Sequence, residues 1–334
     1  MNADFNYDVI LVTFLRPHKL KRCLNALSKL PLPPNRVIIA DQTNLLIGDS
    51  MSSNELKLFF SREKVKEIER LIQVYNDVYT LFKKYLNIKV VKVEFDAGLA
   101  KSRKKALEHS TAKYIFVLDD DIYLPRDALQ VYEILKESHE IGGVALLLKD
   151  RNKIVCKAGD ILYSKKHVSI IADRNKPIYR TSSGIRFMLF DYIPNCALFR
   201  RECLEDYKWD EFFKIGYEHA DFYLTHKRLG KWKFAVSLDH IAIHDHQTGE
   251  SILYLSFRNR PEIFIMNYEY LLKKHNIKSF VVEDVYLTEH TGLKDQILKL
   301  IMFKLLPRPF YCSLYKRILL PRRVKKMIAK AIIK

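Results

Sequence analysis

Short apolar runs alternate with segments of helical periodicity over the first third of the chain, and this alternation constrains the fold more than any other feature. The runs are rich in Val, Ile and Phe and occupy residues 7–14, 36–44, 87–95 and 113–118. After the first run, Leu20, Leu24 and Leu27 recur at helical spacing between Lys and Arg residues. Strands that alternate with helices form βαβ units around a mostly parallel sheet. We therefore predict an α/β fold with a central sheet flanked by helices.

The length and composition suit one large domain. The chain has 334 residues and is 48% hydrophobic, which is ample for a packed core. The segment 45–86 is interpreted as an insertion of one or two helices, and short strands and loops are expected after residue 142. The predicted divisions are a domain at 1–275, with halves at 1–125 and 126–275, and a basic region at 276–334.

Cysteine usage and the N-terminal sequence bear on the compartment. The five cysteines include no C-x-x-C pair, which argues against a disulfide framework and against a zinc site. Asp4 and Asp8 precede the uninterrupted apolar residues that begin at Val9, and no small-residue cleavage pattern follows, so no signal peptide is expected. No segment offers the roughly 18 uninterrupted apolar residues of a membrane-spanning helix. These features predict a cytoplasmic protein.

Positive charge is concentrated at the C-terminal end. Lys+Arg of 57 against Asp+Glu of 39 gives a net charge of +18. Residues 291–334 contain twelve Lys or Arg and one Asp, so 11 of the 18 net charges lie there. Basic residues mixed with apolar ones are typical of helices that lie on anionic membranes. We predict peripheral attachment to the inner face of a membrane through this region. A solvated helical bundle and a nucleic-acid-binding tail are the alternatives, and no nucleic-acid partner is expected.

Three consecutive carboxylates follow the fourth apolar run directly: Asp119, Asp120 and Asp121. In an open α/β sheet, ligands bind at the carboxyl ends of the strands. A divalent cation such as Mg²⁺ or Mn²⁺ would offset the mutual repulsion of these carboxylates and also hold substrate phosphates. Because side chains alternate along a strand, Asp119 and Asp121 are expected on one side and Asp120 on the other. The alternative is a solvated acidic turn.

The stretch "YIFVLDDDIYLPRDAL" resembles the segment of family-2 glycosyltransferases of the GT-A fold in which a D-x-D motif binds a metal ion and the diphosphate of a nucleotide sugar. "DVILVTFLRPHKLKRCLNAL" resembles that family's first strand and helix, and "VIIADQTN" resembles its second strand. "DAGLAKSRKKALEHSTAKYIFVLDDD" is similar to the run that leads to D-x-D. The order and spacing of these matches hold from Asp8 to Ala128, apart from the insertion.

The resemblance implies roles for individual residues on the donor side. The implied nucleotide-sugar-binding residues are Thr13, Arg16, Asp41, Asp96, Gly98, Arg103, Asp119 and Asp120. The implied ligands of a Mn²⁺ or Mg²⁺ ion are Asp119, Asp121, His244 and His246. The chain departs from the family at Asp96, where Asn is frequent. Asp41 as a plain loop residue and Arg103 as one charge on a helix face are the alternatives.

A second resemblance bears on the catalytic base. "WDEFFKIGYEHADFYLTHKRLG" resembles the family segment in which a Gly precedes an acidic pair that opens a helix. An inverting transfer needs a base that takes the proton of the acceptor hydroxyl. Glu218 and Asp221 share one helical face near the helix N-terminus, and His219 stands where the family has its usual catalytic Asp. The candidates are therefore Asp221, Glu218 and His219, and a carboxylate is favoured.

The implied acceptor-binding residues are Asn195, Gly216, Trp232 and Arg258, the last in "YLSFRNRPEI". Together these features predict an inverting, metal-dependent glycosyltransferase. It would move a hexosyl or N-acetylhexosaminyl group from a nucleotide sugar, preferably a UDP-sugar, to a glycan or lipid-linked acceptor in cell-surface polysaccharide synthesis. A noncatalytic binding protein on the same fold is one alternative. A sugar-phosphate nucleotidylyltransferase is another, although "TFLRPHKL" lacks the glycine-rich loop that such an enzyme needs.

Overall fold

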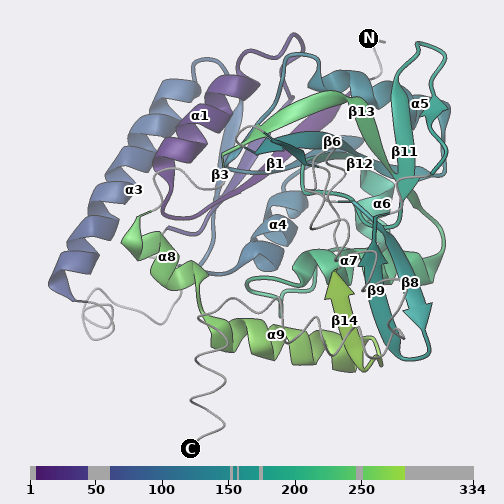
Figure 1. Ribbon diagram of the computed structural model, residues 1–334. Helices are drawn as coiled ribbons and strands as arrows, with labels where there is room; N and C mark the ends of the chain where they lie inside the picture. The colour runs from purple at the N-terminus through teal and green to yellow at the C-terminus, as the bar shows by residue number, and fades with distance from the viewer. Residues whose placement is uncertain are drawn as a thin grey trace, which may run out of the picture.

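A computed structural model describes residues 5–43, 61–150, 153–155, 158–172, 176–245 and 251–282. One large sheet runs through the centre of this part of the chain, and helices cover it (Figure 1). The layering follows from the sequence, because strands that are apolar on both faces need cover on both faces.

The first part of the sheet is parallel, in the order β3, β2, β1, β4. Its strands are β1 (Tyr7–Thr13), β2 (Val37–Asp41), β3 (Ile88–Lys92) and β4 (Tyr114–Asp119). All of β1 is buried. Val9 and Leu11 join one hydrophobic cluster, and Ile10 and Val12 join the cluster on the opposite face. The four predicted strands are thus confirmed.

The second part of the sheet mixes directions. Strand β12 (Ala197–Arg200) runs antiparallel between β4 and β6 (Ile141–Asp150). Strand β6 pairs in parallel with β13 (Lys233–His244). The other strands of this sheet within the described residues are β5 (Ile122–Tyr123), β7 (Lys153–Val155), β10 (Tyr179–Arg180) and β11 (Arg186–Phe190). The predicted α/β class, mostly parallel in its core, is confirmed.

Helices cover both faces of the sheet. The helices of the described residues are α1 (Pro17–Leu27), α3 (Arg62–Phe82), α4 (Leu99–Glu108), the 3-10 helix η1 (Ala128–Val131), α5 (Tyr132–Glu137), α6 (Arg201–Asp206), α7 (Glu218–Leu229), α8 (Ile252–Arg258) and α9 (Pro261–Lys274). Leu20, Leu24 and Leu27 of α1 pack into the cluster that contains Val9, as their spacing predicted. Helix α3 packs beside α1, whereas α4 contributes to the cluster on the other face (Figure 1).

A small second sheet lies beyond the main one. It consists of β8 (Asp160–Ser164), β9 (His167–Ile171) and β14 (Ser279–Val282). The backbone N–H of Phe280 donates to the hydroxyl of Tyr268, 3.3 Å away, and so ties β14 to α9. Most of the predicted basic C-terminal region, residues 283–334, lies outside the described residues. Within the described ranges, no helix has both the length and the apolar character needed to cross a bilayer.

The carboxyl ends of several strands meet at one edge of the main sheet. Thr13 pairs with Asp41, and Val12 pairs with Asp119. Strand β13 reaches the same edge, because His244 pairs with Ile122. Polar residues that are far apart in the sequence are therefore gathered where an α/β sheet binds its ligands.

Candidate active site

Two of the three carboxylates at the end of β4 line a pocket of about 200 Å³. Asp119 and Asp121 line the pocket, with side-chain exposures of 25% and 6%. The side chain of Asp120 is fully buried. The alternation expected from strand geometry therefore holds at this position.

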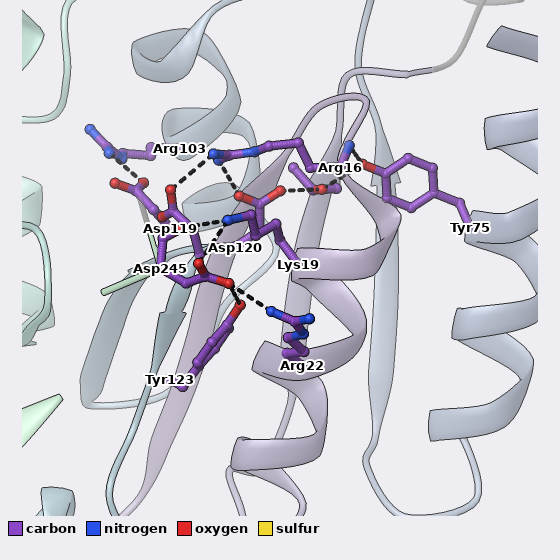
Figure 2. A network of polar contacts seen from close by, with 11 residues as sticks. Arg16, Lys19, Arg22, Tyr75, Arg103, Asp119, Asp120, Tyr123 and Asp245 are labelled. Atoms are coloured by element: carbon purple, nitrogen blue, oxygen red, sulfur yellow. Dashed lines mark hydrogen bonds and ion pairs between the residues drawn. The ribbon is translucent and has the colours of Figure 1, made fainter. Parts of the chain in front are cut away.

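Two arginines neutralise this acidic cluster (Figure 2). Arg16 bonds to both Asp120 and Asp121, with 2.9 Å between its Nη1 and Oδ2 of Asp121. Nη2 of Arg103, a fully buried side chain, donates to Oδ1 of Asp119 at 2.8 Å. Guanidinium groups therefore reach the three carboxylates from two directions and offset their mutual repulsion.

The pKa values of the carboxyl groups reflect this arrangement. Burial alone would raise the pKa of Asp119, but the charges of Arg103, Arg258 and Arg16 outweigh burial and lower it. Burial raises the pKa of Asp120 to about 7; Arg16 opposes this rise and Asp121 adds to it. The neighbouring arginines therefore outweigh burial at Asp119 but not at Asp120.

The turn after β1 places Arg16 over the pocket. The hydroxyl of Thr13 donates to Oδ2 of Asp120 at 2.7 Å, which ties the ends of β1 and β4 together. The guanidinium of Arg16 lies 4.6 Å from the ring centre of Tyr254 in α8. Its backbone N–H donates to the hydroxyl of Tyr75 at 2.8 Å. Arg16 therefore has both its backbone and its side chain fixed.

Two tyrosines of α3 support the site, and the sequence analysis did not identify them. The Tyr75 hydroxyl lies 2.7 Å from Oγ1 of Thr13, and the Tyr79 hydroxyl donates to Oδ2 of Asp41 at 2.8 Å. The only sign of this role in the sequence was the spacing of the two tyrosines, which is about one helical turn. Asp41 also accepts the backbone N–H of Thr43 and does not line the pocket. Burial raises its pKa. Asp41 is therefore a buried residue of the strand end, beside the pocket.

The loop before α4 forms another wall. The backbone N–H of Gly98 donates to Oε1 of Gln42 at 2.8 Å, and the φ of Gly98 is +94°. A Cβ at this position would lie 2.6 Å from the Cα of Lys214, so only glycine allows the two backbones to approach. Asp96 pairs with Lys214 at 2.9 Å and with Arg260 at 2.6 Å. Both Asp96 and Lys214 line the pocket.

The opposite wall comes from β13 and α8. His244 lines the pocket, as do Tyr254, Phe257 and Arg258. The predicted ligand His246 lies outside the described residues. His244 and Arg258 are thus placed together with Asp119 and Asp121, although they are distant in the sequence.

Glu218 and Asp119 both contact the side chain of Arg103. Glu218 is the first residue of α7 and follows Gly216 and Tyr217, whose φ values of +77° and +67° make the turn into the helix. Its Oε1 is 3.7 Å from Nη1 of Arg103. Its Oε2 is buried and has no hydrogen-bond partner within the part of the chain that the structure describes. Arg103 therefore links Glu218 to Asp119.

The other two candidate bases, Asp221 and His219, lie next to other parts of the protein. Asp221 is fully buried and accepts hydrogen bonds from Tyr207, Lys274 and His275, at 2.5, 3.0 and 2.8 Å. This carboxylate holds α7 to α9. Neither Asp221 nor Glu218 lines the pocket. The Nε2 of His219 lies 2.6 Å from the carbonyl oxygen of Ile193. The sequence analysis left Asp221 and Glu218 open as the favoured carboxylates, and the oxygens of Asp221 already bind structural donors.

Three predicted acceptor-side residues lie outside the pocket lining. Asn195 precedes β12, whose first residue, Ala197, pairs with Val117 near the end of β4. Gly216 neighbours Ile215, which does line the pocket. Trp232 precedes β13, at the opposite end of that strand from His244, and its indole N–H donates to Asp206 at 2.6 Å. The structure does not bring Trp232 to the site.

The donor set suits one mode of metal binding. Among the described residues, no group of three or more His, Cys, Asp or Glu side chains converges as an ion cage. Mg²⁺ and similar ions are commonly held by one or two carboxylates together with substrate phosphates and water. Asp119 and Asp121 offer two carboxylates on the wall of a pocket that also contains Arg258 and Lys214. These residues fit an ion that is bound together with a diphosphate.

A family comparison bears on this arrangement. The model of the family described as glycosyl transferase family 2 matches residues 73–208. Residues 73–208 belong to family 2 of the glycosyltransferases. This family-2 segment is less than half of the chain and contains Arg103 and the three carboxylates, but it ends before Glu218. The predicted family is confirmed over this segment.

Solved structures give a more distant likeness. Staphylococcus aureus TarS 1-349 has a TM-score of 0.44 and 15% identity; the match covers 80% of this chain and 65% of that one. The same fragment in complex with UDP has a TM-score of 0.45 and 16% identity, over 90% and 72% of the two chains. A mannosyltransferase of Pyrobaculum calidifontis, in complex with GDP-Man and Mn²⁺, has a TM-score of 0.47 and 11% identity, over 98% and 80%. These values are too low to assign a substrate. No curated protein matches the chain.

Proposed function

We propose that this chain is an inverting, metal-dependent glycosyltransferase that uses a UDP-sugar and glycosylates a hydroxyl of a glycan or lipid-linked acceptor. The observation that carries the proposal is the pocket at the carboxyl edge of the sheet, where Asp119 and Asp121 face Lys214 and Arg258. A site that binds the diphosphate of a nucleotide sugar needs carboxylates that hold a metal ion and cations that hold the phosphates. The wider role is in cell-surface polysaccharide synthesis.

The walls of the pocket suit the two parts of a nucleotide. The rings of Phe14 and Phe257 line the pocket and contact each other edge to face, with centroids 5.5 Å apart. Aromatic rings of this kind stack on bases, whichever base is present. Arg258 and Lys214 supply positive charge for the phosphates. We assign residues 1–125 to the nucleotide-sugar half and 126–275 to the acceptor half.

Asp119 and Asp121 would hold the divalent ion, with His244 beside them. A bound Mn²⁺ or Mg²⁺ supplies positive charge that stabilises the departing nucleoside diphosphate. The residues of the chain have their own parts in the reaction. Arg103 fixes the carboxylate of Asp119, and Arg16 fixes that of Asp121. The pocket thereby presents preorganised carboxylates to the donor.

Glu218 is our candidate for the base that accepts the proton of the acceptor hydroxyl. Its buried Oε2 lacks a hydrogen-bond partner among the described residues, whereas the oxygens of Asp221 are bound by Tyr207, Lys274 and His275. A carboxylate with a spare acceptor position suits proton transfer better than one that already binds several donors.

The test is calorimetric titration with UDP, GDP, dTDP and CMP, each with and without Mn²⁺. We expect one nucleotide to bind in a Mn²⁺-dependent manner and the Asp121→Asn variant to lose this binding at least tenfold. Asp127→Asn is the matched control, because Asp127 is an exposed carboxylate on the chain just beyond the cluster. Folded protein that binds no nucleotide, or equal losses in both variants, would refute the proposal.

A further inference from the structure

Two hollows flank the outer surface of α1. One has a volume of about 750 Å³ and lies between α1 and the end of α3; the other has a volume of about 390 Å³ and lies between α1 and the ends of β5 and β13. Arg22, Asn25 and Lys29 line both hollows, so they form a ridge along α1. We refer to the ridge and its two hollows as the α1 face.

The α1 face is positively charged. His18 and Lys21 line the first hollow and Arg126 lines the second, while no Asp or Glu lines either one. Lys21, Lys29 and Arg126 form no ion pair within the described ranges of the chain. By contrast, Lys104 and Lys136 pair with carboxylates at 2.6 and 3.5 Å. The unpaired charges leave an uncompensated positive field over this surface.

The positive charges of the α1 face affect the pKa of His18. Burial, followed by the neighbouring charges of Lys19, Arg22 and Arg16, lowers the pKa of the His18 imidazole. An anion placed in the first hollow would therefore meet several cationic neighbours and no nearby carboxylate in the lining.

Exposed apolar side chains stand beside these cations. The exposed fractions are 66% for Tyr85, 41% for Leu81 and 52% for Ile243. Tyr85 and Leu81 line the first hollow, and Ile243 lines the second. Apolar side chains set among basic ones are the composition of surfaces that lie at a membrane interface, where the cations meet lipid phosphates and the apolar groups enter the headgroup boundary.

We propose that the α1 face binds the anionic headgroup layer of a membrane. The charges favour an anionic partner, and the exposed Tyr85, Leu81 and Ile243 favour a lipid surface over a soluble polyanion, which offers no apolar layer. None of the residues that line the two hollows belongs to the basic region after residue 282. The inference does not depend on the proposed function, since membrane binding can be measured without a donor.

Such docking would bring the candidate active site to the bilayer. Helix α1 begins directly after Arg16, which lines the pocket. Arg22 also pairs with Asp245 at 2.9 Å, and Asp245 adjoins the pocket residue His244. An acceptor anchored in the same membrane would then lie close to the pocket. The α1 face is therefore the surface expected to orient the enzyme toward a lipid-linked acceptor.

The experiment is co-sedimentation of the full chain with vesicles of phosphatidylcholine alone or with 30 mol% phosphatidylglycerol. The test variant is Lys21→Gln/Lys29→Gln. The control is Lys153→Gln/Lys165→Gln, which removes the same charge from exposed lysines, one at the start of β7 and one between β8 and β9. Each basic residue near an anionic surface contributes about fivefold to partitioning, so the test variant should bind about 25-fold more weakly than wild type. We expect unchanged melting temperatures for both variants.

The outcomes separate the possible partners. A large loss in the test variant, with little change in the control, supports the α1 face. Equal binding by wild type and test variant, or equal losses in test and control, would overturn it. The proposal would also be overturned if the test variant lost binding to inorganic polyphosphate but kept its binding to vesicles, because the α1 face would then bind a soluble polyanion. Absence of nucleotide binding would instead concern only the proposed transferase.

Discussion

Replacement of Arg103 by methionine removes the buried cation that holds the acidic edge together. Its side chain is fully buried and contacts Asp119 at 2.8 Å and Glu218 at 3.7 Å. Arg103→Met would leave both carboxylates without this partner, and removal of one member of a buried pair costs about 3–5 kcal/mol. Since the Asp119 side chain is 25% exposed, water offsets part of the loss, and we expect about 3 kcal/mol. Urea unfolding at neutral pH measures this change.

A neighbouring lysine provides the matched control for Arg103→Met. Lys104 follows in the same helix and pairs with Glu211 at 2.6 Å, but its side chain is 35% exposed. Lys104→Met should therefore change the free energy of unfolding by at most about 1 kcal/mol. If Arg103→Met also costs less than about 1 kcal/mol, Arg103 is not the counter-ion of this cluster. Mn²⁺ should restore part of the stability of Arg103→Met and little of that of Lys104→Met, because only the first variant leaves carboxylates of the cluster uncompensated.

Three further perturbations test the scaffold. Lys19→Met should lower the free energy of unfolding by about 2 kcal/mol in urea titrations, because the buried ammonium pairs with Asp245 at 3.1 Å; an unchanged value would contradict this role. Gly98→Ala should cost more than about 2 kcal/mol and weaken nucleotide binding, since its Cβ would meet backbone at 2.6 Å. Gly230→Ala, where nothing lies within 4 Å, should cost about 1 kcal/mol, and equal losses would argue against the clash. Burial lowers the pKa of His226 from 6.5 to about 4, so wild-type stability should fall by about 3 kcal/mol as the pH is lowered across this range. His226→Phe should lose this part of the pH dependence, and an unchanged slope would refute it.

The sequence predicted the parallel part of the sheet because its signals are local. Strands β1, β2 and β4 are runs of mostly apolar residues, and this composition alone predicts that they are buried. The leucines of α1 recur at helical spacing. The position of the three carboxylates at the end of a strand also followed from this pattern. Local periodicity therefore sufficed to place Asp119 and Asp121 at the binding edge.

The partners of these carboxylates were harder to predict. Thr13, Tyr75 and Asp120 form one hydrogen-bonded chain, although Tyr75 comes from a helix that was interpreted only as an insertion. Such contacts depend on how α3 packs against α1, and no periodicity encodes that packing. The sequence left the choice between Glu218 and Asp221 open for a similar reason. Both lie on one helical face, but only the tertiary contact of α7 with Lys274 and His275 reveals which carboxylate is already bound.

The most direct test of the central claim is the release of nucleoside diphosphate from a panel of UDP- and GDP-sugars in the presence of Mn²⁺. Wild type should release the diphosphate from one donor. Asp121→Asn and Glu218→Gln should reduce the rate at least a hundredfold, whereas Asp127→Asn should not. A wild-type protein that is folded but inactive toward every donor would contradict the account, as would full activity in both Asp121→Asn and Glu218→Gln.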